Sequence, residues 1–253
     1  MRPRRIIALS IAFAASSVLA SAQTAQSLTE IESKYNQIEA AMTAENKAWR
    51  KKLDSCKSKA EKEKLYKAYP DAAKYHPQLT ALMKSNPKDP GSAKAAIWVL
   101  TGSETPEQAH DSIEILKKYH INSKALDDSI AILWFTRKPE VKGLLNDYIL
   151  KRKDSAQVTK AKYSLARILM QEKSTDEAIK LFQAVEQEGK NLYEFKNSSR
   201  TLAETATAYI YEAKFLQIGK KAPDIVGTDV NGKKLKLSDF AGKVIMLDFF
   251  GFW

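Results

Sequence analysis

The sequence contains few of the residues on which most catalytic and metal sites depend. Among its 253 residues it has one cysteine, Cys56, and three histidines. One thiol cannot form a disulfide within the chain, even in an oxidising compartment that permits such bonds. We interpret Cys56 as a small buried or half-buried helix residue, because it lies in phase with an apolar helical stripe. An intermolecular disulfide is the alternative.

The histidines do not form a recognisable ligand set. His76, His110 and His120 are scattered along the chain and lack the spacing of metal ligands. We expect them to have surface or packing roles, and we predict no metal site. The sequence also lacks a phosphate-binding loop, a nucleophile elbow and a defensible pair of catalytic carboxylates. It therefore gives no reason to predict a cofactor.

One strongly apolar run stands at the N-terminus. Three arginines within residues 2–5 precede an apolar stretch over residues 6–19, and residues 20–22 read Ala-Ser-Ala. This order predicts a signal peptide that is cleaved near Ala22. The run is too short for a comfortable membrane span, although an uncleaved anchor is the alternative. We therefore expect an exported protein, periplasmic or extracellular after cleavage.

The chain is basic, with 41 Lys and Arg against 30 Asp and Glu and a net charge of +11. The three arginines of the signal account for 3 of these charges, which leaves about +8. A basic balance can favour nucleic acid or an anionic surface. However, the lysines are scattered over polar helix faces without interleaved aromatic residues. We expect an ordinary solvated surface, no nucleic-acid partner, and membrane contact only through an uncleaved signal segment.

Apolar residues recur at three- and four-residue steps between residues 28 and 216, which predicts a series of helices. The predicted helices cover residues 28–65, 71–84, 92–100, 106–119, 123–135, 139–150, 155–171, 175–188 and 197–216. The first is long and has a single apolar stripe from Leu28 to Ala60. Packing of this stripe onto the following helices is favoured over a two-chain coiled coil. Tyr69-Pro70 and the segment 86–91 break the helical pattern.

One helix pair, within residues 161–187, has repeat character. Small and large apolar residues lie there at offsets typical of a tetratricopeptide pair: Leu165, Ala166, Ala178, Phe182 and Val185. Only this unit matches well, so we predict a helical-hairpin array of tetratricopeptide-like character. Such an array can bind a peptide on its face, or its helices can simply pack on one another. Both possibilities remain open.

The last 35 residues, 219–253, have a different pattern. Asn231-Gly232 separates two short runs with alternating apolar residues, which predicts a β-hairpin. Ser238-Asp239 then opens a single turn, and the apolar run from Lys243 to Phe250 predicts a buried strand. A strand this apolar is an aggregation hazard if uncovered. We therefore expect the sequence to be a fragment of a longer protein, with this strand loosely packed on the helices or poorly ordered.

Four motifs in this segment resemble the opening of a thioredoxin-like domain of the redoxin and TlpA type. They are G-x-x-A-P-D at residues 219–224, D-x-N-G-K at 229–233, L-S-D-F-x-G-K at 237–243 and D-F-F-G-F-W at 248–253. The preceding helical region is similar, more diffusely, to that of exported TlpA-like proteins. The resemblance implies a mainly α array followed by an incomplete α/β domain. We therefore divide the sequence into a signal peptide (1–22), a helical domain (23–216) and a redoxin-domain fragment (217–253).

The resemblance also implies a reaction, thiol–disulfide exchange at a Cys-x-x-Cys that would follow Trp253. Those cysteines are not in the sequence, so we expect part of an exported thiol–disulfide oxidoreductase that is inactive as it stands. Its expected partner is a protein with a disulfide or dithiol.

Two residues match the surroundings of the implied redox site. Asp248 matches the buried strand acid that relays a proton to the resolving thiol, although an ordinary carboxyl near a sheet end is the favoured interpretation. Trp253 matches the aromatic residue that flanks the first cysteine and shapes the docking surface. The alternatives to an oxidoreductase are a thiol peroxidase of the peroxiredoxin type, which shares two of the motifs, and a helical scaffold that binds a partner protein.

Overall fold

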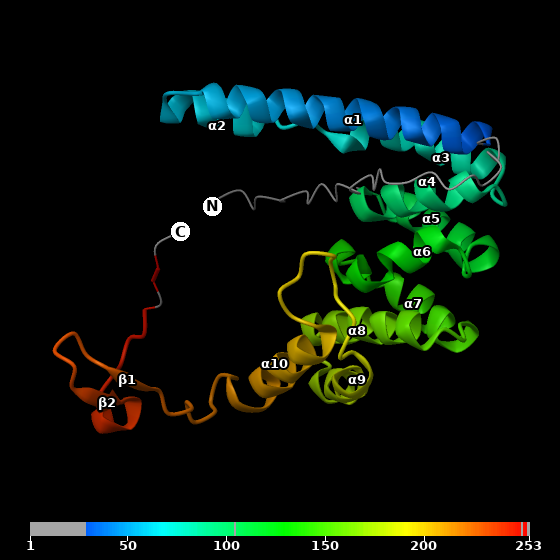
Figure 1. Ribbon diagram of the computed structural model, residues 1–253. Coiled ribbons are helices and arrows are strands. Elements are labelled where there is room, and N and C mark those ends of the chain that lie inside the picture. Colours follow the sequence, from blue (N-terminus) through cyan, green and yellow to red (C-terminus); the bar gives the residue numbers. More distant parts are fainter. Residues whose placement is uncertain (1–28, 104, 249, 252–253) are drawn as a thin grey trace.

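The computed structural model describes residues 29–103, 105–248 and 250–251, and helices dominate it (Figure 1). In chain order the helices are α1 (Glu30–Ser55), α2 (Lys59–Lys67), α3 (His76–Ser85), α4 (Pro90–Gly102), α5 (Pro106–Tyr119), α6 (Lys124–Ser129), α7 (Val141–Lys151), α8 (Ser155–Gln171), α9 (Thr175–Glu188) and α10 (Leu202–Phe215). Two short strands follow, β1 (Val226–Thr228) and β2 (Lys234–Lys236). The predicted fold class, a mainly α region followed by a β-hairpin, is confirmed.

The predicted signal peptide, residues 1–22, lies outside the described residues. Among the helices of the described part, none combines the length and the apolar character needed to cross a membrane.

Helix α4 forms the centre of the helical region. It begins at Pro90, and the Asp89 side chain caps it by accepting a hydrogen bond of 2.7 Å from the Gly91 amide. Its small and branched residues are almost fully buried: Ala93, Ala95, Ala96, Ile97, Val99 and Leu100. Helices α1, α3, α5 and α6 all contact it. A helix that is apolar over most of its surface must be covered on several sides, which explains this central position.

Helix α1 crosses α4 at very short range. A Cβ placed on Gly91 would lie 2.5 Å from the backbone nitrogen of Glu32, so only glycine fits at this crossing. Beyond it, the Tyr35 and Trp98 rings meet edge to face with centroids 5.7 Å apart, and Lys94 pairs with Glu32 at 2.6 Å. The first half of the predicted stripe therefore packs onto the following helices, as expected.

The predicted helix over residues 28–65 is in fact two helices. The side chain of Ser58 accepts a hydrogen bond from the Glu61 amide, and Glu61 accepts one from the Ser58 amide. This capping box starts α2 and separates it from α1. Cys56 is the C-cap residue of α1 and is half-buried, so its predicted burial is confirmed, but it ends the helix instead of lying inside it.

Three other predicted helices differ in type or by more than two residues in extent. The helix expected over residues 71–84 begins as a 3₁₀ turn, η1 (Ala72–Tyr75), before α3. The one expected over 123–135 changes into a 3₁₀ helix, η2 (Ile130–Thr136), where the buried hydroxyl of Ser164 accepts the hydrogen bond of the Trp134 amide. The last helix begins at Leu202 instead of residue 197, because Thr201 and Glu204 form a capping box there.

The predicted repeat-like pair is confirmed as helices α8 and α9, whose bounds coincide with the predicted ones. All five residues assigned to its interface are buried: Leu165, Ala166, Ala178, Phe182 and Val185. Helix α10 packs on α9 as well, and the Phe182 and Tyr209 rings stack at 5.1 Å. These three helices continue the array away from α4 (Figure 1).

The crossing of α1 and α4 can be tested with two glycine substitutions. Gly91→Ala pushes a methyl group into the backbone of α1 and should destabilise the protein by about 1–3 kcal/mol. Gly143→Ala in α7 is the matched control, because its Cβ would approach only the Lys117 amine, at 3.9 Å. It should be neutral or stabilise by about 0.5–1 kcal/mol. Urea unfolding measures both, and equal effects would contradict the close approach.

Candidate functional site

The segment with the redoxin-like motifs folds around the β1–β2 hairpin, which lies apart from the helical array (Figure 1). The strands are antiparallel, with Val226 opposite Lys236 and Thr228 opposite Lys234. Asp229 accepts hydrogen bonds from the amides of Asn231 and Lys233, at 2.9 and 2.8 Å. Gly232 adopts φ of 82°, a conformation that favours glycine. The D-x-N-G-K motif therefore builds the predicted turn.

Two of the motifs are joined by a carboxylate. Asp224, the last residue of G-x-x-A-P-D, accepts hydrogen bonds from both the amide and the hydroxyl of Ser238, each at 2.9 Å. These bonds lower the pKa of the Asp224 carboxyl. Ser238 belongs to L-S-D-F-x-G-K, so the two motifs hold the chain entering β1 against the turn that follows β2.

That turn is the 3₁₀ helix η3 (Leu237–Phe240), which confirms the single turn predicted at Ser238-Asp239. Asp239 accepts a hydrogen bond from the Lys236 amide at 2.8 Å and so holds the start of the turn. Gly242, at φ of 84°, then reverses the chain so that the following residues return alongside the hairpin. Asp239 and Gly242 of the motif thus each have an identifiable backbone role.

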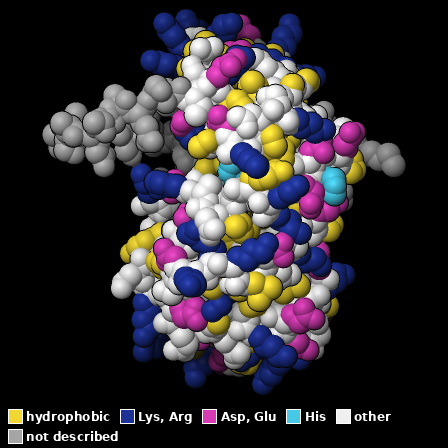
Figure 2. Space-filling view, turned by 90° about the vertical axis from the view of Figure 1, so that its right-hand side faces the viewer, with side chains coloured by type: hydrophobic (Ala, Val, Ile, Leu, Met, Phe, Trp, Pro, Cys, Tyr) yellow, Lys and Arg dark blue, Asp and Glu magenta, His cyan; other side chains and the backbone are white. Residues whose placement is uncertain are grey.

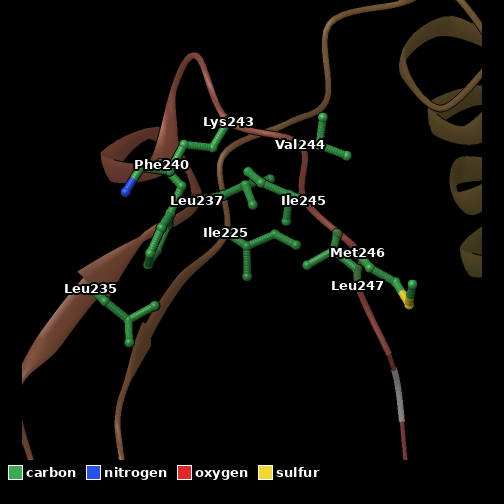
Figure 3. A pocket seen from close by; sticks show the side chains of 9 residues that line it. All are labelled: Ile225, Leu235, Leu237, Phe240, Lys243, Val244, Ile245, Met246 and Leu247. Carbon is green, nitrogen blue, oxygen red and sulfur yellow. The ribbon is translucent and has the colours of Figure 1, made fainter.

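The returning chain and the hairpin enclose an open apolar hollow of about 350 Å³. Ile225, Leu235, Leu237 and Phe240 line one side, and Ile245 and Leu247 point toward them from the other (Figure 3). Exposure alternates along the returning chain, at 105% for Val244, 43% for Ile245, 92% for Met246 and 51% for Leu247. This period of two is that of an extended strand with one face on the hairpin.

The prediction of a buried strand over Lys243–Phe250 is wrong for this structure. Among the described residues of the run, none belongs to a strand, and all are exposed. The run also lies beside its own hairpin, not on the helices (Figures 1 and 3). A strand is defined by hydrogen bonds to a neighbour, and the ladder of this segment joins only β1 and β2. The run thus shows the alternating side-chain exposure of a strand but not the hydrogen-bonded pairing of one.

Of the two residues predicted at the redox site, the structure describes only Asp248. Asp248 is exposed, and it follows Leu247 in the alternation, so it belongs with Val244 and Met246 on the side away from the hairpin. Trp253 lies outside the described residues. Cys56 is at the end of α1, at the opposite end of the molecule from the hairpin (Figure 1). The structure thus places the only thiol of the sequence far from the redoxin-like motifs.

The histidines have the predicted surface and packing positions. His110 is exposed, His76 and His120 are buried, and the Nε2 atom of His120 lies 2.8 Å from the Pro87 carbonyl oxygen. Burial lowers the pKa of His120. Within the described ranges, no group of three His, Cys, Asp or Glu side chains could hold a metal ion.

Sequence reasoning missed a polar and aromatic cluster around Arg167 of α8. Its guanidinium stacks on the Trp134 ring at 3.4 Å and on the Tyr209 ring at 4.5 Å, and it donates a hydrogen bond to the Tyr163 hydroxyl. Glu194, from the loop before α10, accepts hydrogen bonds from the Trp134 indole and the Tyr163 hydroxyl. The members satisfy one another, so the cluster joins this loop to α8 and η2.

Comparisons with known proteins match only a short part of the chain. The thiol-disulfide oxidoreductase ResA of Bacillus thuringiensis subsp. konkukian is 47% identical over 45 residues, which are 18% of this chain and 26% of that protein. ResA of Bacillus anthracis is 53% identical over 38 residues, 15% and 22% of the two chains. ResA of Geobacillus kaustophilus is 40% identical over 47 residues, 19% and 27%.

The chain thus spans about a quarter of the length of these curated relatives. No family model matches the sequence, and no solved structure matches it significantly. The comparisons therefore support a family relation to thiol–disulfide oxidoreductases.

The Asp224–Ser238 contact predicts a pH-dependent change confined to the hairpin segment. The Asp224 pKa is lowered, so the contact is fully present above the ordinary value of 3.8 and is lost as the pH falls through the lowered pKa. The Ser238 amide chemical shift, followed by NMR, should therefore titrate with a midpoint below 3.8. Asp224→Ala should abolish this titration, whereas Asp248→Ala, at an exposed carboxyl, should leave it unchanged. A midpoint at or above 3.8 would contradict the contact.

The Arg167 cluster predicts a stability effect. Arg167→Met keeps most of the side-chain volume but removes the cation–π contacts with Trp134, Tyr163 and Tyr209 and the hydrogen bond to Tyr163. It should destabilise the protein by about 1–3 kcal/mol. Arg200→Met, at an exposed arginine, is the control and should change the free energy of unfolding by less than about 0.5 kcal/mol. Urea unfolding followed by tryptophan fluorescence distinguishes the two variants.

Proposed function

We propose that residues 217–253 are the N-terminal part of a redoxin-type domain and that the chain belongs to an exported thiol–disulfide oxidoreductase. The observation that carries this proposal is the short, high-identity match to ResA proteins, which are named as thiol–disulfide oxidoreductases. The hairpin segment adds support, because Asp224 and Ser238 give two of the redoxin-like motifs a shared structural role. The names of these relatives favour a disulfide reductase or oxidase over a thiol peroxidase.

The proposed chemistry is exchange between a protein disulfide and a pair of thiols. The first thiolate attacks a substrate sulfur and forms a mixed disulfide, and the second thiol then displaces the reduced product. This sequence contributes only Cys56, which lies at the far end of the helical array, so we expect the chain to have no turnover of its own. The contribution proposed for residues 217–253 is structural.

The proposed role of Asp248 depends on burial. A carboxyl that relays protons to a resolving thiol has a raised pKa because it is removed from water. Asp248 is exposed here, on the side of the returning chain that faces away from the hairpin. We propose that further strands and helices of a complete domain would cover this side, and that Trp253 would then flank the first cysteine.

We further propose that the helical region is exported with the redox segment after removal of residues 1–22. The Arg167 cluster makes internal contacts with Trp134 and Glu194, so it gives no reason to propose a binding site there. The expected partner is a protein that carries a disulfide or dithiol.

A chimera tests the proposed function. The remainder of a thioredoxin-family domain, beginning at its Cys-x-x-Cys, is joined after Trp253, and dithiothreitol-driven reduction of insulin is measured. The unmodified chain should show no rate above the buffer, because it has no resolving thiol pair. The chimera should be active, and the same chimera with both grafted cysteines changed to serine should not be.

Two results would contradict the proposal. Turnover by the unmodified chain would show that a different nucleophile acts in it. A chimera that gains the circular dichroism of an α/β domain yet reduces no insulin would show that residues 217–253 do not complete a working redoxin fold.

A further inference from the structure

The end of α1 and the whole of α2 form a strongly basic projection, here called the basic arm (residues 47–67). It contains nine cationic side chains: Lys47, Arg50, Lys51, Lys52, Lys57, Lys59, Lys62, Lys64 and Lys67. Only Asp54, Glu61 and Glu63 oppose them, so the arm has a net charge of +6. More than half of the chain's excess of +11 is therefore concentrated in 21 residues.

The cations of the arm differ from those of the helical body in their partners. All nine are exposed, and among the described residues none of them takes part in an ion pair. In the body, Lys84, Lys94, Lys117 and Lys162 each pair with an acid of another helix, and Lys142 pairs with Glu172 at the end of α8. Figure 2 shows acidic and basic side chains interspersed over one face of the molecule. The scattered surface expected from the sequence thus describes the body but not the arm.

Aromatic residues hold the arm together, which sequence reasoning did not anticipate. The Trp49 indole donates a hydrogen bond of 2.7 Å to the Leu65 carbonyl, and its ring meets those of Tyr69 and Tyr66 at 4.9 and 5.9 Å. These contacts fold α2 back along α1, while the first half of α1 is fixed on α4. The arm projects past the other helices as a two-helix hairpin (Figure 1).

The clustering of like charges in the basic arm is electrostatically unfavourable without an anionic partner. Lys47, Arg50 and Lys51 share one face of α1 at three- and four-residue spacing, where like charges destabilise a helix. All three are exposed, and Tyr66 of α2, whose ring meets Trp49, is 52% exposed. An exposed array of cations without ion pairs suits a broad anionic surface, and exposed tyrosine is typical of the membrane–water interface.

We propose that the basic arm docks the protein onto an anionic phospholipid surface. Lysine and arginine side chains near such a surface are attracted over roughly a Debye length, about 10 Å at 0.1 M salt, and several of them act together. The contact is peripheral and electrostatic. It is separate from any insertion of residues 1–22, and it does not depend on the proposed redox function.

Cys56 provides a specific probe of this contact, because it is the only cysteine and lies between α1 and α2. A donor fluorophore on Cys56 is combined with vesicles that carry an acceptor lipid. Energy transfer then reports the arm itself, even where other segments of the full chain also bind. We expect strong transfer with vesicles of phosphatidylglycerol and phosphatidylcholine, little with phosphatidylcholine alone, and a decrease with rising salt.

Charge variants provide the control. Lys47→Glu, Lys51→Glu and Lys62→Glu combined should weaken binding at Cys56 by about tenfold or more. Lys153→Glu, Lys180→Glu and Lys190→Glu combined make the same change of net charge at exposed lysines of the body and should have a much smaller effect. A milder triple, with glutamine at residues 47, 51 and 62, keeps the test valid if the reversed arm unfolds, as circular dichroism would show.

Three outcomes would overturn the proposal. The arm and body variants could weaken transfer equally, which would indicate a general effect of net charge. Transfer could be the same on neutral and anionic vesicles, which would indicate apolar insertion. Finally, the arm could bind soluble polyglutamate while giving no transfer to anionic vesicles, which would identify an acidic polypeptide as its partner.

Discussion

The close crossing of α1 and α4 at Gly91 is the constraint on which the helical region depends. It brings the two backbones together and fixes the first half of α1 on the central helix. Because α4 presents small residues on several sides, α3, α5 and α6 also approach it closely and share one apolar core. The direction of the basic arm follows from this crossing, and the Trp49 contacts with Tyr66 and Tyr69 then hold α2 along the far end of α1.

Away from α4, polar contacts determine how the later helices are placed. Asp127 accepts hydrogen bonds from the Tyr148 hydroxyl at 2.5 Å and from Arg152 at 2.7 Å, which ties α6 to the end of α7. The Ser164 hydroxyl and Arg167 then join α8 to η2 and to the loop before α10. Apolar packing alone tolerates small slips between helices, whereas buried polar groups need particular partners, so these contacts specify one arrangement.

The sequence predicted the elements whose signals are local. Helices α5, α8 and α9 were predicted with their observed bounds, because apolar spacing and terminal residues define them within a few turns. The Asn231-Gly232 turn was predicted for the same reason. The capping box at Ser58 and Glu61 is equally local and could have been found. By contrast, the 3₁₀ geometry of η2 depends on Ser164, 30 residues away from Trp134, and no local pattern reveals such a partner.

The residues of the candidate redox segment likewise fall into two groups: those that need only nearby partners, and those that need partners from elsewhere in the fold. Its polar motif residues, Asp224, Asp229 and Asp239, satisfy nearby backbone groups and shape the hairpin without outside help. Its apolar run cannot be covered by the hairpin alone, because Val244 and Met246 project from one side while Ile245 and Leu247 project from the other. A strand that is apolar on both faces is typical of the covered interior of an α/β sheet, where neighbouring strands supply its hydrogen bonds. The hairpin covers part of one face only, so the motifs account for the local shape of this segment, and its stability as a sheet requires strands that the described residues do not provide.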